Sequence, residues 1–444
     1  MRVLFLEFDT EHDWAVASLG PAFLAAYLRE HGHEAAFVRV PVDRVIDDIA
    51  AEVRREAPDL IGVSMTTRQW LRARDVLGEL RRISNIPVIA GGLHATFSPD
   101  DVLRHDGFDY VCLGEGEAAL LELVEALEAG RDMTDGSIAN IWAKGGSRPR
   151  LRDPIEPLDS VPFLARDMLD EKWGVRHLST QRGCPFPCTY CAARMYDKLY
   201  ASGDTTAYGR RRGLDNVLAE LNALRASGPL NYVIFLDDTF TIHHPWVREF
   251  CKVYAKEFAV PFSLNARVET VNEIMLHELA AAGCRHIVYG VESGSERVRR
   301  EIMKRSATNQ RFRDVFRWTR EAGIMATANY IIGTPGESRA EMQETIALHG
   351  DLRPADFAFF VFYPYPGTEL FQVCQEKGYL PENYLTLPAN HRRSILKLPN
   401  VTQEEIAEVY RQWTQLRVAT TLARGAVPDP DQVAASIQAS AARG

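Results

Sequence analysis

The stretch Arg182-Gly183-Cys184-Pro185-Phe186-Pro187-Cys188-Thr189-Tyr190-Cys191 places three cysteines within eight residues. Their spacing is C-x-x-x-C-x-x-C, and no fourth cysteine lies nearby. Closely spaced cysteine thiolates are the usual ligands of iron–sulfur clusters. Three thiolates on one loop would hold three irons of a 4Fe-4S cluster and leave the fourth iron open to another ligand.

A structural zinc site is the alternative interpretation of these cysteines. Zinc usually takes four protein ligands, often as two C-x-x-C pairs, and a second pair is missing here. The other cysteines of the seven stand singly, at 112, 251, 284 and 374. An odd number of cysteines with one tight group indicates a reducing compartment, so we expect a cytoplasmic protein.

With an aromatic residue, Tyr190, before the third cysteine, the motif resembles the signature of radical S-adenosylmethionine (SAM) enzymes. The resemblance implies that Cys184, Cys188 and Cys191 ligate the cluster and that Tyr190 lies beside the bound cofactor. The open iron would chelate the amino and carboxylate groups of SAM. An external one-electron donor of the flavodoxin or ferredoxin type would reduce the cluster, and SAM would be cleaved to a 5′-deoxyadenosyl radical.

Length and composition set the remaining bounds. The 444 residues are enough for two domains and an extension. The sequence is 46% hydrophobic and 25% charged, with a formal net charge of −9, which argues against nucleic acid as a partner. The N-terminus lacks the pattern of a signal peptide. No apolar run reaches the roughly 18 residues of a membrane span, so no integral membrane segment is expected.

Residues 1–140 alternate strand and helix patterns. The predicted strands are Val3–Phe8, Ala35–Val40, Leu60–Ser64, Val88–Ala90 and Tyr110–Leu113, and helices are predicted at Pro21–His31 and Val42–Glu56. This alternation predicts an α/β domain with a doubly wound, Rossmann-like parallel sheet. Such sheets bind ligands beyond the carboxyl ends of their strands. The polar and glycine-rich segments of the domain fall at those ends.

These segments resemble the cobalamin-binding domain that is fused to one branch of radical SAM enzymes. The resemblance implies that cobalamin contacts the following residues: Ser64, Thr66, Gly91, Gly92, His94, Gly114, Glu115 and Glu117. The D-x-H-x-x-G motif, whose histidine ligates cobalt in other cobalamin proteins, is absent, so the motif supplies no histidine ligand, and Thr67, Arg68 and Gln69 are the candidates to meet the lower face of cobalt. A flavodoxin-like sheet that has lost its cofactor is the alternative, because glycines also serve tight turns.

A Gly-, Pro- and charge-rich linker is predicted at 141–171, followed by a second α/β domain at 172–372. Its predicted strands are His177–Thr180, Tyr232–Leu236, Phe262–Asn265, His286–Tyr289, Ala328–Ile332 and Phe357–Tyr363. Six such units with the cysteine loop after the first strand resemble the partial (β/α) barrel of radical SAM enzymes. Sites in β/α barrels lie at the carboxyl ends of the strands.

SAM contacts are therefore expected at those strand ends. Asp237 and Asp238 stand where the family holds the SAM ammonium, although the family often has Gly-Gly-Glu there; for Asp238 a helix N-cap is an equal alternative. Arg267 would bind the SAM carboxylate. The resemblance implies that Glu292, helped by Ser293, binds the ribose, and that the backbone at Gly333 meets the adenine.

Residues 373–444 are predicted to be a C-terminal helical extension. Thr402 through Ala423 has helical periodicity, with Thr402 as N-cap and Glu405 three residues on. The last segment, 426–444, is Ala-rich and polar and is expected to fray. Tyr363 and Tyr365, at the barrel mouth, are expected to line a substrate pocket.

The resemblance covers residues 1 to about 370 and implies a cobalamin-dependent radical SAM enzyme. The favoured activity is methylation of an unactivated carbon in a small molecule of secondary-metabolite, lipid or tetrapyrrole type. One alternative is an oxidative cyclase or rearrangement enzyme of the anaerobic protoporphyrin cyclase type. Another is a non-catalytic iron–sulfur electron-transfer protein, which would need no SAM site.

Overall fold

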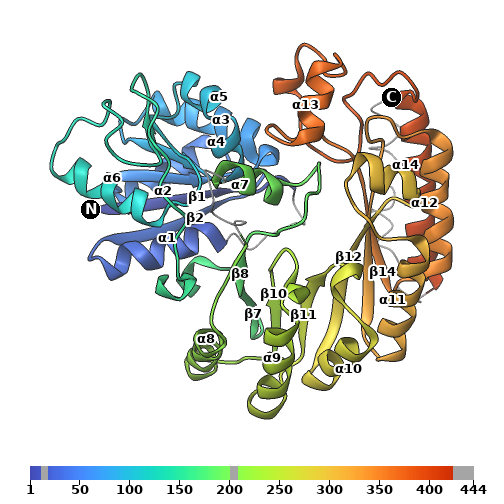
Figure 1. The fold of residues 1–444 in the computed structure, drawn as a ribbon. Coiled ribbons are helices and arrows are strands. Elements are labelled where there is room, and N and C mark those ends of the chain that lie inside the picture. Colours follow the sequence, from blue (N-terminus) through green and yellow to red (C-terminus); the bar gives the residue numbers. More distant parts are fainter. Residues whose placement is uncertain (12–18, 201–208, 424–444) are drawn as a thin grey trace.

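The computed structural model describes residues 1–11, 19–200 and 209–423. They form two α/β lobes, each built on a six-stranded sheet (Figure 1). The cysteine loop and the helix that follows it lie between the two lobes (Figure 1). Within the described residues, no helix combines the length and the apolar character that crossing a bilayer requires.

The N-terminal sheet has the strand order β2-β1-β3-β4-β5-β6. Its strands are β1 (Arg2–Phe8), β2 (Glu34–Val40), β3 (Leu60–Ser64), β4 (Val88–Gly91), β5 (Tyr110–Cys112) and β6 (Ile141–Ala143). The first five are parallel, and β6 pairs antiparallel with β5. The chain order reverses between β1 and β3, which is where ligands bind in sheets of this kind.

Helices cover both faces of this sheet. They are α1 (Leu19–Glu30), α2 (Ile46–Glu56), α3 (Thr67–Arg81), α4 (Gly92–Phe97), α5 (Pro99–Arg104) and α6 (Glu117–Glu128). α1 and α6 share one core with the sheet, and α2, α3 and α5 share the other. The strands are buried on both faces, which explains why they are continuous apolar runs in the sequence.

The second sheet is entirely parallel, with the order β14-β13-β12-β11-β10-β7. Its strands are β7 (Val175–Leu178), β10 (Tyr232–Phe235), β11 (Phe262–Ala266), β12 (Cys284–Glu292), β13 (Met325–Ile332) and β14 (Asp356–Val361). The edge strands β7 and β14 do not pair with each other, so the barrel is partial. A separate two-stranded ribbon joins β8 (Gln181–Arg182) to β9 (Arg210–Arg211).

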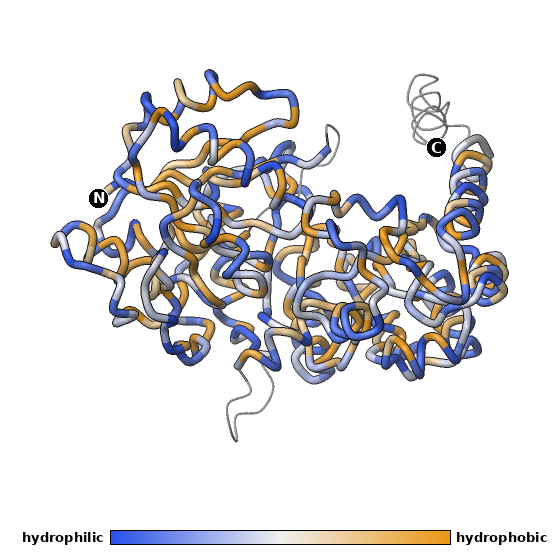
Figure 2. Tube along the Cα trace, turned by 90° about the horizontal axis from the view of Figure 1, so that it is seen from above, coloured by the Kyte–Doolittle hydropathy of each residue, from blue (hydrophilic) through white to orange (hydrophobic). Residues whose placement is uncertain are grey.

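The helices of this lobe are α7 (Ala192–Tyr200), α8 (Leu214–Ser227), α9 (His244–Glu257), α10 (Glu273–Ala282), α11 (Asn309–Glu321), α12 (Arg339–Leu352), α13 (Glu369–Glu376) and α14 (Gln403–Ala423). Short helical turns occur at Leu158–Ser160, Arg166–Met168, Phe240–Ile242, Val268–Thr270, Val298–Ile302 and Tyr384–Thr386. Figure 2 shows hydrophobic and hydrophilic residues alternating along the helices, as expected where one helix face covers a sheet.

The α/β architecture predicted for both lobes is confirmed, and the strands deviate from their predicted ends by a few residues. The predicted α14 is present with its cap, since the Thr402 N–H donates to Glu405 Oε2 at 2.8 Å. α14 is part of the barrel lobe: Ile406, Val409 and Trp413 belong to its main hydrophobic core. The segment 426–444 lies outside the described residues.

Two predicted domain limits differ from the elements that the structure contains. The linker predicted from 141 begins with β6, which is a strand of the N-terminal sheet. α13 runs across the predicted limit at 372/373. Both differences arise because the three-residue strand β6 and the short helix α13 are recognised by their tertiary packing, and neither is long enough to show a clear periodicity.

Candidate functional site

The three clustered cysteines lie on the loop between β8 and α7. Cys184 and Cys188 are buried and Cys191 is half-buried. Gly183, directly before the first cysteine, has φ +86°, a conformation that glycine adopts without strain. Burial raises the pKa of the Cys191 thiol to about 12. A bound metal cluster would favour the thiolate form of this buried sulfur.

The three cysteines put three possible sulfur ligands on one loop, two of them buried and one half-buried. In a 4Fe-4S cluster each cysteine ligates a different iron, so three thiolates would hold three of the four irons. A structural zinc ion usually takes four protein ligands. The residues of the loop thus fit a cluster by number and chemistry.

Arg267 lies directly against the cysteine loop. Its Nη1 donates a hydrogen bond to Cys188 Sγ at 3.0 Å, and its Nη2 pairs with Glu269 at 2.7 Å. The guanidinium also stacks on Phe186 at 3.9 Å from the ring centroid. Hydrogen bonds to cysteine sulfurs tune the potential of iron–sulfur clusters. The predicted role of Arg267 at the SAM carboxylate remains a prediction, and its contact with Cys188 is a role that the sequence did not suggest.

Asp237 fixes the start of the cysteine loop. Its carboxylate is 2% exposed and accepts hydrogen bonds from the Thr180 N–H, the Gln181 N–H and the hydroxyls of Ser179 and Thr180. These donors belong to the segment that leads into and begins β8. The sequence did not suggest this role, and the predicted pairing of Asp237 with the SAM ammonium stays a prediction.

Asp238, the next residue, is exposed at the same strand end and has no side-chain hydrogen bond within the described residues. Partial desolvation, followed by repulsion from Asp237, raises the pKa of its carboxyl. Its charge also acts on Cys184 and Cys191, which places it beside the cysteine loop. Of the two aspartates, Asp238 is the one available to a cationic ligand.

Glu292 lies in a buried group of charges beneath the cysteine loop. It ends β12, where a register shift and its own φ of +68° turn the backbone. Its carboxylate pairs with Arg305 at 3.3 Å, and Arg305 also donates to the Tyr190 hydroxyl at 3.1 Å. Burial raises the pKa of Glu292 in spite of Arg305. Tyr190 and Glu292, both predicted at the SAM site, are thus brought together, and their contacts with SAM remain predictions.

Ser293 and Gly333 both have structural roles in the barrel lobe. Ser293 is 0% exposed, and its Oγ lies 3.4 Å from Thr345 Oγ1 of α12. Gly333 has φ +78°, a backbone conformation that favours glycine, and it lies against Ile406 of α14. The predicted contacts of Ser293 with the ribose and of the Gly333 backbone with adenine stay predictions.

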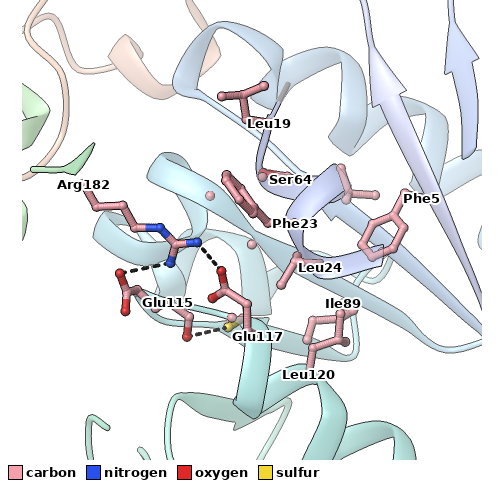
Figure 3. A pocket seen from close by; sticks show the side chains of 18 of the residues that line it. Phe5, Leu19, Phe23, Leu24, Ser64, Ile89, Glu115, Glu117, Leu120 and Arg182 are labelled. Atoms are coloured by element: carbon pink, nitrogen blue, oxygen red, sulfur yellow. Dashed lines mark hydrogen bonds and ion pairs between the residues drawn. The ribbon is translucent and has the colours of Figure 1, made fainter. Parts of the chain in front are cut away.

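A cavity of about 300 Å³ lies at the carboxyl ends of the N-terminal strands (Figure 3). Most of its lining is apolar, from residues such as Phe5, Leu24, Ile89 and Leu120. Six of the eight residues predicted to contact cobalamin line it, namely Ser64, Gly91, Gly92, Gly114, Glu115 and Glu117. Arg182 and Tyr196 of the second lobe also line it. The cavity therefore opens at the junction of the two lobes, next to the cysteine loop.

Thr66 and His94 are not among the residues that line this cavity. Thr66 caps α3, since its N–H donates to Gln69 Oε1 at 2.9 Å. His94 is 2% exposed and stacks on Trp70 at 4.7 Å between ring centroids. Burial lowers the pKa of His94 to about 4, so it is neutral. Both side chains serve the capping and packing of α3 and α4, and their predicted cobalamin contacts stay predictions.

Sequence reasoning missed the arginines at this junction. Arg182 pairs with Glu115 at 3.2 Å and with Glu117 at 2.5 Å (Figure 3). Arg210 pairs with Glu115 at 2.5 Å. The run Arg210-Arg211-Arg212 and the alternating acids of Gly114-Glu115-Gly116-Glu117 are visible in the sequence, but no local rule pairs them.

Comparison with known proteins agrees with this geometry. Residues 14–124 match the family model of the B12 binding domain, and residues 178–349 match that of the Radical SAM superfamily. The chain is 30% identical over 415 residues to an uncharacterized methyltransferase of Pyrococcus horikoshii, covering 89% of this chain and 86% of the relative. It is 26% identical to an anaerobic magnesium-protoporphyrin IX monomethyl ester cyclase of Rubrivivax gelatinosus, covering 85% of this chain and 70% of the relative.

A solved structure has the same fold. The radical SAM methyltransferase TsrM from Kitasatospora setae, with cobalamin and a 4Fe-4S cluster bound, superposes with a TM-score of 0.68 and 18% identity. The match covers 93% of this chain and 81% of that one. The cavity, the cysteine loop and the two matched domains together identify the family. This chain belongs to the radical SAM enzymes that carry an N-terminal B12-binding domain.

Proposed function

We propose that this enzyme methylates an unactivated carbon of a small-molecule substrate, using cobalamin in the N-terminal cavity and a 4Fe-4S cluster on Cys184, Cys188 and Cys191. The observation that carries the proposal is the continuity of the two sites. Arg182 lines the cavity, and Cys184 follows it by two residues in the chain. Two cofactors that act on one substrate must lie within reach of it, and this junction provides that proximity.

Each cofactor would supply a reaction that amino-acid side chains do not perform. When bound, a 4Fe-4S cluster on Cys184, Cys188 and Cys191 would supply the electron for the reductive cleavage of SAM that yields a hydrogen-abstracting radical, and cobalamin in the cavity would supply the methyl group. The protein binds and orients. Asp238 offers a carboxylate to the SAM ammonium, and Arg267 and Glu292 lie buried beside the cysteine loop. The surrounding buried side chains exclude water from this region.

The cavity fits the cobalamin nucleotide tail in its chemistry. Its apolar walls suit an aromatic base, and glycines at 62, 91, 92 and 114 leave room at the strand ends. Gly92 has φ +83°, and a Cβ there would crowd the backbone of Met65.

Names of relatives favour methylation over cyclisation. The relative at 30% identity is described as a methyltransferase, and the cyclase is at 26%. The test is turnover under anaerobic conditions with reductant, hydroxocobalamin and SAM that carries a labelled methyl group, using extract fractions of the native host as substrate source. Methylation predicts the label in a new product. A new product without the label, formed together with 5′-deoxyadenosine, would assign the enzyme to the cyclase type instead. An external one-electron donor of the flavodoxin or ferredoxin type would serve as the natural reductant.

Filling the cavity tests where cobalamin binds. Ser64 lies at the end of β3 and lines the cavity, so Ser64→Phe should place a ring in that space. Overpacking costs about 1–3 kcal/mol, which corresponds to roughly a 5- to 150-fold loss of affinity for hydroxocobalamin. Equilibrium binding followed by absorbance measures it. Ser227→Phe, at an exposed position that ends α8, is the matched control. Equal affinities of the two variants would place cobalamin elsewhere.

A further inference from the structure

The ribbon of β8 and β9 encloses the whole cysteine segment. In its register Arg182 faces Arg210 and Gln181 faces Arg211. The three cysteines and α7 follow Arg182 of β8 in the chain and precede Arg210 of β9. Whatever fixes these two arginines therefore fixes both ends of the segment that holds the cluster.

One pair of ribbon residues contacts the barrel. Gln181 Nε2 donates to the carbonyl oxygen of Thr239 at 2.9 Å, and Arg211 Nη2 donates to that of Phe240 at 2.8 Å. Arg211 also lies over the ring of Trp246, 4.5 Å from its centroid. The alternation of side chains along a strand places the other pair on the opposite face.

The other pair contacts the N-terminal lobe through one carboxylate. Glu115 pairs with Arg210 at 2.5 Å and with Arg182 at 3.2 Å, and its Oε2 accepts from the Ile155 N–H at 2.7 Å. The side chains of Glu115 and Arg210 are each 7% exposed. Charge-assisted pairs of arginine with a buried carboxylate are strong and directional.

The backbone of Glu115 holds a third point of the cysteine segment. Its N–H donates to the Tyr200 hydroxyl at 2.8 Å, and Tyr200 ends α7, the helix that begins directly after Cys191. Gly114 allows this approach, because a Cβ there would overlap the Tyr200 hydroxyl. Glu115 thus contacts Arg182 and Arg210, one in each strand of the ribbon, and Tyr200 at the end of α7.

The same loop forms part of the cavity wall. Gly114, Glu115, Gly116 and Glu117 all line the cavity (Figure 3). The group that would contact cobalamin on one side therefore holds the cluster segment on the other. A shift of this loop changes the separation of the two sites directly, because Glu115 pairs with Arg182 and Arg210 of the ribbon.

We propose that Glu115 is a positioning residue that sets the distance between the cluster and cobalamin by holding Arg182, Arg210 and Tyr200 at the cavity wall. This inference rests on the proposed function, because it assumes that both cofactors bind. A misplacement of about 1 Å can reduce a reaction 100-fold, so a fixed separation has a direct catalytic value. Glu115 acts through the ribbon and does not need to touch a reacting atom.

The test measures the separation itself. Full-length protein is loaded anaerobically with iron, sulfide and hydroxocobalamin and is then reduced, so that the cluster and cob(II)alamin each carry an unpaired electron. Pulsed electron paramagnetic resonance gives the distance distribution between the two spins. For Glu115→Gln we expect the mean to shift by about 1 Å or more, or the distribution to broaden, among the molecules that hold both cofactors, which are the only ones that give a distance between two spins.

The control is Glu56→Gln, which removes a carboxylate that pairs with Arg2 at 2.6 Å within the N-terminal lobe. It should leave the distribution as in the wild type. A second variant, Arg210→Lys, keeps the positive charge but loses the planar guanidinium that reaches Glu115. It should broaden the distance distribution, and it replaces Glu115→Gln if that variant fails to fold. A wild type that binds only one cofactor refutes the proposed function. If the wild type binds both cofactors and its distance distribution is unchanged in Arg210→Lys and in Glu115→Gln, the positioning role of Glu115 is overturned.

Discussion

Cys188→Ala is expected to abolish the release of 5′-deoxyadenosine from SAM. The three cysteines act as one unit, and removing one member of such a unit loses nearly all activity, here at least about a thousandfold. Cys188 is also the sulfur that accepts the hydrogen bond from Arg267, so the substitution removes the contact that ties the loop to β11. The measurement is 5′-deoxyadenosine formed by anaerobic protein with reductant and SAM, together with iron bound per chain.

The control for this prediction is another buried cysteine. Cys251, on α9, is 4% exposed and belongs to the hydrophobic core of the barrel lobe. Cys251→Ala removes the same sulfur atom from a site that holds no iron in the proposal. It should retain both iron and 5′-deoxyadenosine release. Full release by Cys188→Ala would refute the assignment of the cluster to this loop.

Asp237→Ala and Asp238→Ala are expected to affect different properties, stability in the first and SAM affinity in the second, although the residues are neighbours. Asp237→Ala leaves the buried N–H groups of Thr180 and Gln181 without their acceptor, and each such group costs about 1–3 kcal/mol. We expect the free energy of unfolding to fall by about 2–4 kcal/mol and the iron content to fall with it, because the start of the cysteine loop is no longer fixed. Denaturant unfolding and iron analysis measure both.

Asp238→Ala should leave stability and iron content nearly unchanged, because no hydrogen bond of its side chain is present within the described residues. Its expected effect is on SAM. A hydrogen bond to a charged group contributes about 1.5–3 kcal/mol, so the affinity for SAM should fall about 10- to 150-fold. Isothermal titration with the reconstituted protein gives this value. An unstable Asp238→Ala protein would show that Asp238 serves the fold. Normal SAM affinity in a stable protein would show that Asp238 does not bind SAM.

The parts of the candidate site that can be located from the sequence are those that depend on local order. The cysteines follow one another within a few residues, so their spacing alone brings them together. Glycines at 91, 92 and 114 lie at the ends of strands of a parallel sheet, and the carboxyl ends of such strands share one edge, so these glycines line one cavity. His94 follows the same strand, but α4 directs its ring toward Trp70, which the sequence does not indicate.

The choice between Asp237 and Asp238 could not be made from the sequence. Both are acids at one strand end, and the side that each side chain takes depends on where Thr180 and Gln181 lie, more than 50 residues earlier. The same holds for Glu115 and Glu117. Their arginine partners lie 65 to 95 residues away, across the junction of the two lobes.

The sequence by itself determined two parallel α/β lobes and a three-thiolate loop, because apolar periodicity and cysteine spacing act over a few residues. Tertiary structure alone decided which acids remain available to ligands and which are consumed by arginines and backbone donors. The physical reason is that a buried carboxylate must be compensated by whatever donors the fold brings to it, and those donors come from distant parts of the chain.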